Sequence, residues 1–193
     1  MKKIILFALV CAFAMSVSAK SKIDRTVFGC TLGVTTSQQA DGLLAKQGTF
    51  KIGGTDMVIL FNPKYADQRW LVGVFQFEDN VLSTIMFLQS NTNIFARLFE
   101  GIKSIPAVTK LFGQMFGDAQ PQELDPLYKK LKQWAKNEYG GCTFREVNAE
   151  DVKKNAQLPK RSFLCTDGGA VMGVVSLSLG ESMEILTMSY MLK

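Results

Sequence analysis

The side chains best suited to chemistry in this chain are its cysteines, because its 193 residues include four cysteines and no histidine. Without histidine the chain cannot build a Ser-His-Asp or Cys-His nucleophile pair or a His-ligated zinc site. Cys30 has no imidazole to activate it as a nucleophile. The sequence therefore predicts no enzyme, no catalytic residue, no cofactor and no metal ligand. A hydrolase that uses carboxylates alone, as glycosidases do, is the catalytic alternative.

Two of the cysteines, Cys142 and Cys165, lie in segments with the alternating pattern of strands. We expect these segments to be antiparallel neighbours with Phe144 opposite Phe163. Because opposite residues share one residue-number sum, the two cysteines then face each other, and a Cys142–Cys165 disulfide is predicted. The alternative is that these two cysteines and Cys30 are all buried thiols that pack as small hydrophobic side chains.

The first 19 residues have the pattern of a cleaved secretion signal. Two lysines precede an apolar run over 4–15, and small residues end the segment at Ala19. We predict cleavage after Ala19 and export to the periplasm or beyond the cell. A transmembrane anchor would need about 20 apolar residues. Lipidation at Cys11 would need a small residue where Val10 stands.

Removal of this leader lowers the positive charge of the chain. The whole sequence has 22 basic and 17 acidic side chains, and the leader takes two lysines with it, so the mature formal charge is +3. A charge this small, without a basic stripe, is not typical of a protein that binds nucleic acid. No nucleic acid is therefore expected as a partner.

Each half of the mature chain predicts one helix. Threonines and glutamines at capping-box spacing open the first helix, at Thr35, Thr36, Gln38 and Gln39. This helix is expected to bury Ala40, Leu43 and Leu44 and to end at Gly48. Asp125 is the predicted N-cap of the second helix, which runs to about Tyr139.

Strand-like runs follow each helix. The apolar runs 70–77 and 81–89, separated by Glu78-Asp79-Asn80, predict a hairpin. In the second half, a turn at 167–169 separates a strand near Phe163 from the runs 171–179 and 183–192. Each half therefore has the order helix, short strand, irregular connection and closing hairpin.

These elements predict an α+β protein made of two tandem helix-plus-antiparallel-meander units, with the helices packed on one face of the sheet or sheets. The units cover 20–90 and 121–193, and a Phe-rich amphipathic helical connection covers 91–120. The two units could also share one continuous sheet of about eight strands.

The entry to the first helix, residues 28–35, reads Phe-Gly-Cys-Thr-Leu-Gly-Val-Thr. With the leader and the tandem pattern, it resembles small exported bacterial proteins of the β-lactamase-inhibitor-protein-like group and the related small outer-membrane assembly lipoproteins. In residues, 33–39 is similar to their Gly-x-Thr-x-x-x-Val helix entry, although Ala40 stands where those proteins often carry valine. The resemblance implies binding to other proteins from an exposed sheet face, and it carries over no catalytic residue.

The connection carries apolar side chains at helical spacing over 94–116, interrupted by Pro106. Its candidates for a hydrophobic contact are Phe95, Leu98, Phe99, Ile102, Phe112, Met115 and Phe116. Two short amphipathic helices of this kind could cover an open sheet face as core, dock on a membrane surface or meet a partner.

A lysine-rich face is expected on the second helix, formed by Lys129, Lys130, Lys132 and Lys136. Such a face could attract an acidic partner or an anionic lipid, but a solvated helix face is the ordinary reading of the pattern. The sequence as a whole predicts an exported, non-catalytic module that binds another envelope or extracellular protein. The alternative function is a carrier of lipid or another hydrophobic ligand that uses 94–116.

Overall fold

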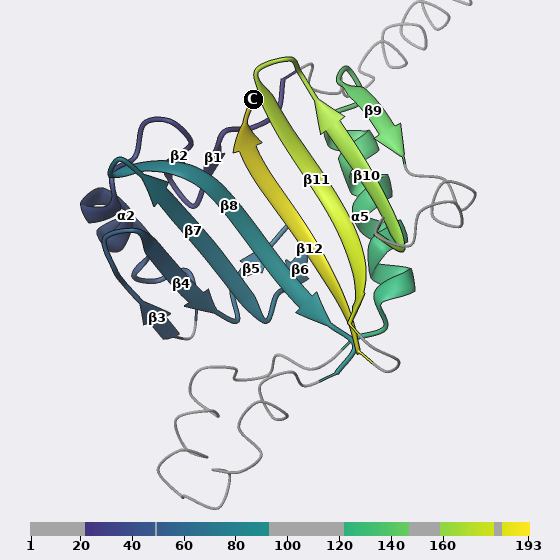
Figure 1. Cartoon of the computed structure of the whole chain (residues 1–193), viewed down its shortest axis with the longest axis horizontal. Helices are drawn as coiled ribbons and strands as arrows, with labels where there is room; N and C mark the ends of the chain where they lie inside the picture. The colour runs from purple at the N-terminus through teal and green to yellow at the C-terminus, as the bar shows by residue number, and fades with distance from the viewer. Residues whose placement is uncertain (1–21, 49, 93–121, 147–158, 180–182) are drawn as a thin grey trace, which may run out of the picture.

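The computed structural model describes residues 22–48, 50–92, 122–146, 159–179 and 183–193. Within them, an eight-stranded antiparallel sheet is accompanied by two two-stranded sheets and two helices (Figure 1). The strands of the large sheet, in chain order, are β3 (Phe50–Ile52), β4 (Met57–Phe61), β7 (Val72–Glu78), β8 (Val81–Ser90), β9 (Thr143–Glu146), β10 (Arg161–Thr166), β11 (Ala170–Leu179) and β12 (Met183–Leu192). The other elements are β1 (Thr26–Val27), β2 (Cys30–Thr31), α2 (Ser37–Leu44), β5 (Lys64–Tyr65), β6 (Gln68–Arg69) and α5 (Leu124–Glu138).

A two-residue turn fixes the register of the first long hairpin. Asp79 and Asn80, between β7 and β8, have φ values of 50° and 64°. Two positive φ values in succession give the turn whose twist matches antiparallel strands, and Asp and Asn tolerate this region better than bulky residues do. Glu78 consequently pairs with Val81. The hairpin predicted at this position is confirmed.

The two halves of the chain are joined through the pairing of β8 with β12. The order of the large sheet is β3-β4-β7-β8-β12-β11-β10-β9, so the closing hairpins of both halves lie side by side at its centre. Ile85 is opposite Tyr190, and Phe87 is opposite Met188. The prediction of two tandem helix-plus-meander units is therefore wrong. Long central strands with matching apolar residues pair with each other and merge the two halves into one predominantly β structure.

Side chains alternate between the two faces of the sheet, and one face carries the core. A single cluster of buried apolar side chains joins both helices to strands from both halves. Phe87 is at its centre, with its ring stacked on Tyr65 at 4.7 Å between centroids and tilted against Trp70 at 5.6 Å. Trp70 donates its indole N–H to the carbonyl of Tyr65 at 3.0 Å, so its one polar atom is satisfied inside the core.

Both helices pack on this core-bearing face. Helix α2 has the predicted capping box, in which the backbone N–H of Gln39 donates to the Thr36 hydroxyl and the Gln39 side chain accepts from the backbone of Thr36. It ends at Leu44, and its Leu43 is 44% exposed instead of buried. Helix α5 begins at Leu124 with Glu123 at its N-cap, two residues before the predicted N-cap Asp125. The Glu123 side chain makes no capping hydrogen bond.

The turn between β10 and β11 is held by Asp167. Its Oδ1 accepts hydrogen bonds from the backbone N–H groups of Gly169 at 2.8 Å and Ala170 at 2.7 Å. Its Oδ2 accepts from the backbone N–H of Ile23 at 3.0 Å, which ties the start of the described chain to the second half. Burial acts to raise the pKa of Asp167, but these three backbone hydrogen bonds and the charge of Arg25 outweigh it, and the pKa is lowered.

Two adjacent residues of β8, one on each face of the sheet, allow the burial of the two faces to be compared. Phe87→Ala is expected to lower the free energy of unfolding by about 3–5 kcal/mol, because it leaves a cavity among the core rings. Met86→Ala, on the opposite face and only partly buried, is the matched control and should cost less than about 1.5 kcal/mol. Urea denaturation of each variant at pH 7 measures the difference. Equal losses would mean that both faces are buried to the same extent.

Candidate functional site

The face of the large sheet opposite the core is an apolar surface that no described helix or strand covers. In Figure 1 it is turned toward the viewer, with α5, β5 and β6 behind the sheet. One row of cross-strand neighbours on it runs through Ile59, Val74, Met86, Ser189, Gly173 and Leu164. The next row runs through Phe61, Val72, Leu88, Thr187 and Val175. Phe61 and Val72 are buried and form a second, smaller apolar cluster with Leu71, so the exposed part of this face lies away from them. We call the residues of both rows, together with their outward-facing neighbours Met57, Gln76, Thr84, Met191, Val171, Ile185 and Leu177, the outer face.

The outer face contains no charged side chain. Charges begin only at its margin, with Glu78 beside the β7–β8 turn and Arg145 on the edge strand β9. Several of its apolar side chains are well exposed: Met57 at 44%, Leu177 and Met191 at 39% each, and Leu164 at 38%. In an antiparallel sheet with one face on the core, the side chains on the exposed face are ordinarily polar. This surface is therefore suited to lie against another apolar surface.

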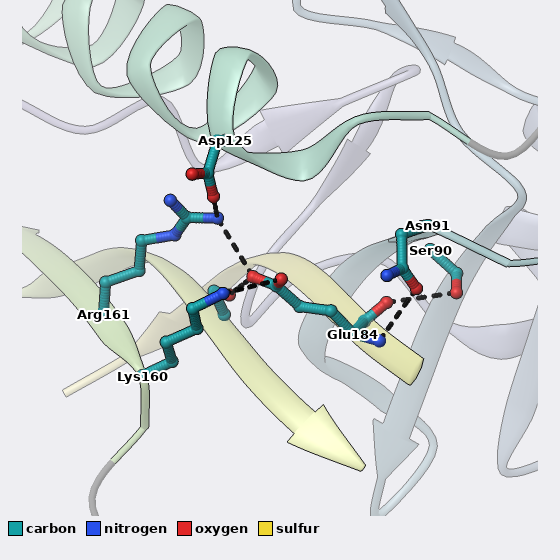
Figure 2. A network of polar contacts seen from close by, with 7 residues as sticks. Ser90, Asn91, Asp125, Lys160, Arg161 and Glu184 are labelled. Carbon is teal, nitrogen blue, oxygen red and sulfur yellow. Dashed lines mark hydrogen bonds and ion pairs between the residues drawn. The ribbon is translucent and has the colours of Figure 1, made fainter. Parts of the chain in front are cut away.

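A polar cluster lies at one end of the opposite, core-bearing face, centred on Glu184 of β12 (Figure 2). The Glu184 carboxylate accepts hydrogen bonds from Lys160 Nζ at 2.9 Å, from Arg161 at 3.0 Å and from the Ser176 hydroxyl. Arg161 also forms an ion pair with Asp125 in the first turn of α5. The arginine thus bridges the helix to the sheet, and we call these five residues the Glu184 cluster.

The main chain of Glu184 holds the junction between the two halves. Its carbonyl accepts from the Ser90 hydroxyl at 3.1 Å and from the Asn91 N–H at 3.2 Å, and its N–H donates to Asn91 Oδ1 at 2.8 Å. The N–H of Gln122 donates to the carbonyl of Ser90 at 3.1 Å. Thr92 donates its N–H to the Ser90 hydroxyl at 3.2 Å. Thr92 and Gln122 therefore lie at the same end of the sheet.

Both carboxylates of the Glu184 cluster are stabilised in their charged form. Burial acts to raise the pKa of Glu184, but hydrogen bonds from Ser176 and Lys160 and the charges of Lys160 and Arg161 outweigh it, and the pKa is lowered. The hydrogen bond from Arg161 lowers the pKa of Asp125. Both carboxyl groups are therefore ionised at neutral pH, and through Arg161 they anchor α5 to the sheet.

Tyr128 of α5 completes this end of the core. The Arg161 guanidinium lies over its ring, with 4.9 Å from Cζ to the ring centroid, which adds a cation–π contact to the ion pairs. Burial, reinforced by the charge of Glu146, raises the pKa of Tyr128 to about 12, although Arg161 opposes the shift. Tyrosine therefore stays protonated at neutral pH here, and its contribution is packing.

The predicted basic face of α5 is partly neutralised. Lys132 forms an ion pair with Glu146 of β9, and Lys130 donates a hydrogen bond to the carbonyl of Asp67 at 2.9 Å. Lys129 and Lys136 are exposed. Two of the four lysines thus have partners within the protein, and the structure brings them to the side of the molecule opposite the outer face.

The register predicted for the cysteines is wrong by two residues. Phe144 of β9 is opposite Cys165 of β10, and Glu146 is opposite Phe163. Cys142 consequently precedes the paired segment and lies diagonally from Cys165. The prediction placed Phe144 opposite Phe163, but a shift of two residues leaves the same side chains facing inward, so the alternating pattern did not fix the register. No disulfide is formed between cysteines of the described residues.

The other predicted contact residues, Phe95, Leu98, Phe99, Ile102, Phe112, Met115 and Phe116, lie outside the described residues. Sequence reasoning expected an exposed sheet face from the resemblance but named none of its residues, and it missed the Glu184 cluster. The outer face had a visible signal, because β8, β11 and β12 lack charged residues at alternate positions. The Glu184 cluster had none, since its side chains are brought together from distant positions by the sheet.

No protein-family model, curated protein or solved structure matches the chain. Among the residues that the structure describes, no group of histidine, cysteine, aspartate and glutamate side chains is arranged to hold a metal ion. In the same part of the chain, no helix is both long and apolar enough to span a membrane.

The Glu184 cluster predicts a defined pH dependence of stability. Glu184→Gln should lower the free energy of unfolding by about 1–3 kcal/mol at pH 7, because hydrogen bonds from charged groups are weakened. The folded-state pKa of Glu184 is lowered from 4.5, so its stabilisation is present above about pH 4.5 and is lost as the pH falls through the folded pKa. The two proteins should therefore converge in acid. Urea denaturation from pH 3 to 7 measures this.

Glu78→Gln, at an exposed turn, is the matched control and should change stability by less than about 0.5 kcal/mol at any of these pH values. A difference between Glu184→Gln and the native chain that stays constant from neutral to acid pH would contradict the assignment of Glu184 as an ionised anchor.

Proposed function

We propose that this protein is an exported, non-catalytic binding module of the bacterial envelope, and that a partner protein packs against its outer face. The observation that carries the proposal is an uncharged, apolar sheet face that is exposed at Met57, Leu164, Leu177 and Met191. Burying such a surface is favourable in proportion to its apolar area, and this supplies a driving force for association. Export through the leader, as the sequence predicts, would place the face where envelope partners are found.

The size of the outer face is compatible with a specific interface. Strands lie about 4.8 Å apart and rise about 3.3 Å per residue, so the six strands of the outer face, with about six to eight residues each, cover roughly 570–760 Å². The part at Phe61 and Val72 is already buried. A standard interface buries about 800 Å² on each partner, and the largest apolar patch of a monomer is typically about 300–600 Å². The area of the outer face is therefore close to that of the largest apolar patch on a typical monomer. Together with the residues at its margins, it reaches the area of a standard interface.

The chemistry of the outer face defines the kind of partner. A charged group placed against it would lose its hydration without gaining a counter-charge. Thr84, Thr187 and Ser189 add hydroxyl groups along its central strands. Glu78 and Arg145 at the margins can pair with charges. We therefore expect a partner that presents an apolar, uncharged surface with a few hydrogen-bonding groups and with charges confined to its periphery.

Carriage of lipid is the alternative function, and its predicted residues at 94–116 lie outside the described part of the chain. An open apolar face would serve an acyl chain less well than an enclosed cavity, because a flat surface leaves the ligand half in water. Native mass spectrometry of protein purified from its own envelope distinguishes the two, since a lipid adduct differs in mass from a bound protein.

Photo-crosslinking tests the proposed surface directly. A photoreactive amino acid at Leu177 or Met191 should capture one envelope protein in cells, and the same residue at Leu43 of α2 should not. Leu43 is 44% exposed but belongs to the opposite side of the sheet, so it is a matched apolar control. Capture of a dimer of this chain, of lipid, or of the same proteins from all three positions would contradict the proposal.

Charged variants test whether the apolar character matters. Leu177→Lys and Met191→Lys should each weaken the crosslinked complex at least tenfold, because the lysine is desolvated without a partner. Leu43→Lys should leave the complex unchanged. Circular dichroism and urea denaturation of the free proteins check that all three variants are folded, as expected for side chains that are more than one third exposed.

Export is tested by intact-mass measurement of the protein recovered from cells. The expected mass is that of a chain beginning at Lys20, because small residues up to Ala19 form the recognised cleavage site. Ala19→Arg should block cleavage and leave the leader attached. A native chain that retains residues 1–19 would contradict the proposed processing.

A further inference from the structure

The thiols of Cys142 and Cys165 are neighbours at the edge of the core, although the two residues are not directly opposite. Phe144 is opposite Cys165 in the β9–β10 register, and Cys142 is two positions before Phe144, so both cysteines belong to the same face. Cys142 packs against the core cluster that contains Cys165. Burial raises the pKa of the Cys165 thiol to about 12, and the neighbouring Cys142 side chain adds to this shift. The register, the shared packing and this interaction together place the two side chains next to each other.

Local geometry lets Cys142 move toward Cys165. It precedes β9 and follows the glycine pair Gly140-Gly141 after α5, and its N–H donates to the carbonyl of Tyr139 at 2.9 Å. Glycines adopt a wide range of backbone angles, so the segment that carries Cys142 can adjust while β10 stays fixed in the sheet. Cys165, by contrast, is fully buried between β9 and β11.

We infer that Cys142 and Cys165 are a dithiol that is oxidised to a disulfide by a thiol–disulfide exchange partner. The thiolate of Cys142, the more accessible of the two, attacks the oxidant's disulfide and releases one thiol. The thiolate of Cys165 then attacks Cys142 Sγ, forming the intramolecular S–S bond and releasing the second thiol. Two cysteine S–H protons are transferred to the two released sulfurs, and the oxidant's disulfide is reduced as the protein's dithiol is oxidised.

The bond would fasten the edge of the sheet to the end of α5. It would close a loop of about 24 residues. Closing a loop of this length lowers the conformational entropy of the unfolded chain and so stabilises the folded state. For a protein of this size the midpoint of thermal unfolding should rise by about 6–12 °C. Among the described strands, β9 is at an edge of the large sheet and pairs with β10 alone, so an added tether would strengthen its attachment.

Cys30 supplies an internal control. It lies in β2, is fully buried and is packed in the same core cluster. Burial alone raises the pKa of the Cys30 thiol to about 11. The pKa of Cys165 is raised to about 12, first by burial and then by the neighbouring Cys142. Among the described residues, the difference between the two buried thiols is therefore the second cysteine beside Cys165. Cys30→Ser should therefore not change the oxidation of the other two cysteines, whereas Cys142→Ser and Cys165→Ser should each abolish it.

The experiment uses the purified mature chain, fully reduced and then equilibrated with oxidised and reduced glutathione. We expect a mass loss of about 2 Da, a linked Cys142–Cys165 peptide after digestion, and the rise in thermal midpoint, all of which persist in Cys30→Ser. Circular dichroism confirms that each variant is folded before oxidation. Retention of three alkylatable thiols, or a linkage that includes Cys30, would overturn the inference.

In cells the bond depends on the proposed export, because exported proteins meet an oxidising environment. Alkylation of thiols before lysis tests this separately. If the bond forms with glutathione but the protein trapped in cells is reduced, then the export proposal fails while the dithiol assignment stands. If it does not form with glutathione, the dithiol assignment fails and export is unaffected.

Discussion

The pairing of β8 with β12 is the constraint on which the rest of the structure depends. These strands come from distant parts of the chain, and their register brings Ile85 against Tyr190 and Phe87 against Met188. Forming non-local pairs costs loop-closure entropy, which the burial of large apolar side chains must offset. Once the two strands pair, the hairpins on either side extend them into one sheet, whose larger apolar cluster contains residues of both halves.

The two faces of this sheet carry different side chains. The core-bearing face holds the aromatic cluster, both helices and, at one end, the Glu184 cluster that anchors α5. The outer face has neither charge nor a described covering element. Because side chains alternate along every strand, the same pairing that completes the core also gathers the apolar residues of the other face into a continuous surface. The proposed binding surface is thus a consequence of forming a wide sheet.

Local sequence signals predicted local structure well. The capping residues of α2 and the turn at Asp79 and Asn80 act within a few residues, so their chemistry is visible in the sequence. The cysteine register was wrong because one strand can slide past another in steps of two residues without changing which side chains face inward. The Glu184 cluster was not predictable, since Lys160, Ser176 and Asp125 have no sequence pattern that relates them.

The sequence by itself determined the absence of histidine chemistry, the positions of the hairpin turns and the alternating apolar pattern of the long strands. Only the tertiary structure decided that both halves share one sheet, that Arg161 bridges Asp125 and Glu184, and that Cys142 meets Cys165. The physical reason is the range of the interactions. Turns and caps depend on neighbouring residues, whereas strand order depends on which distant apolar surfaces fit together, and one sequence alone does not encode that choice in any local pattern.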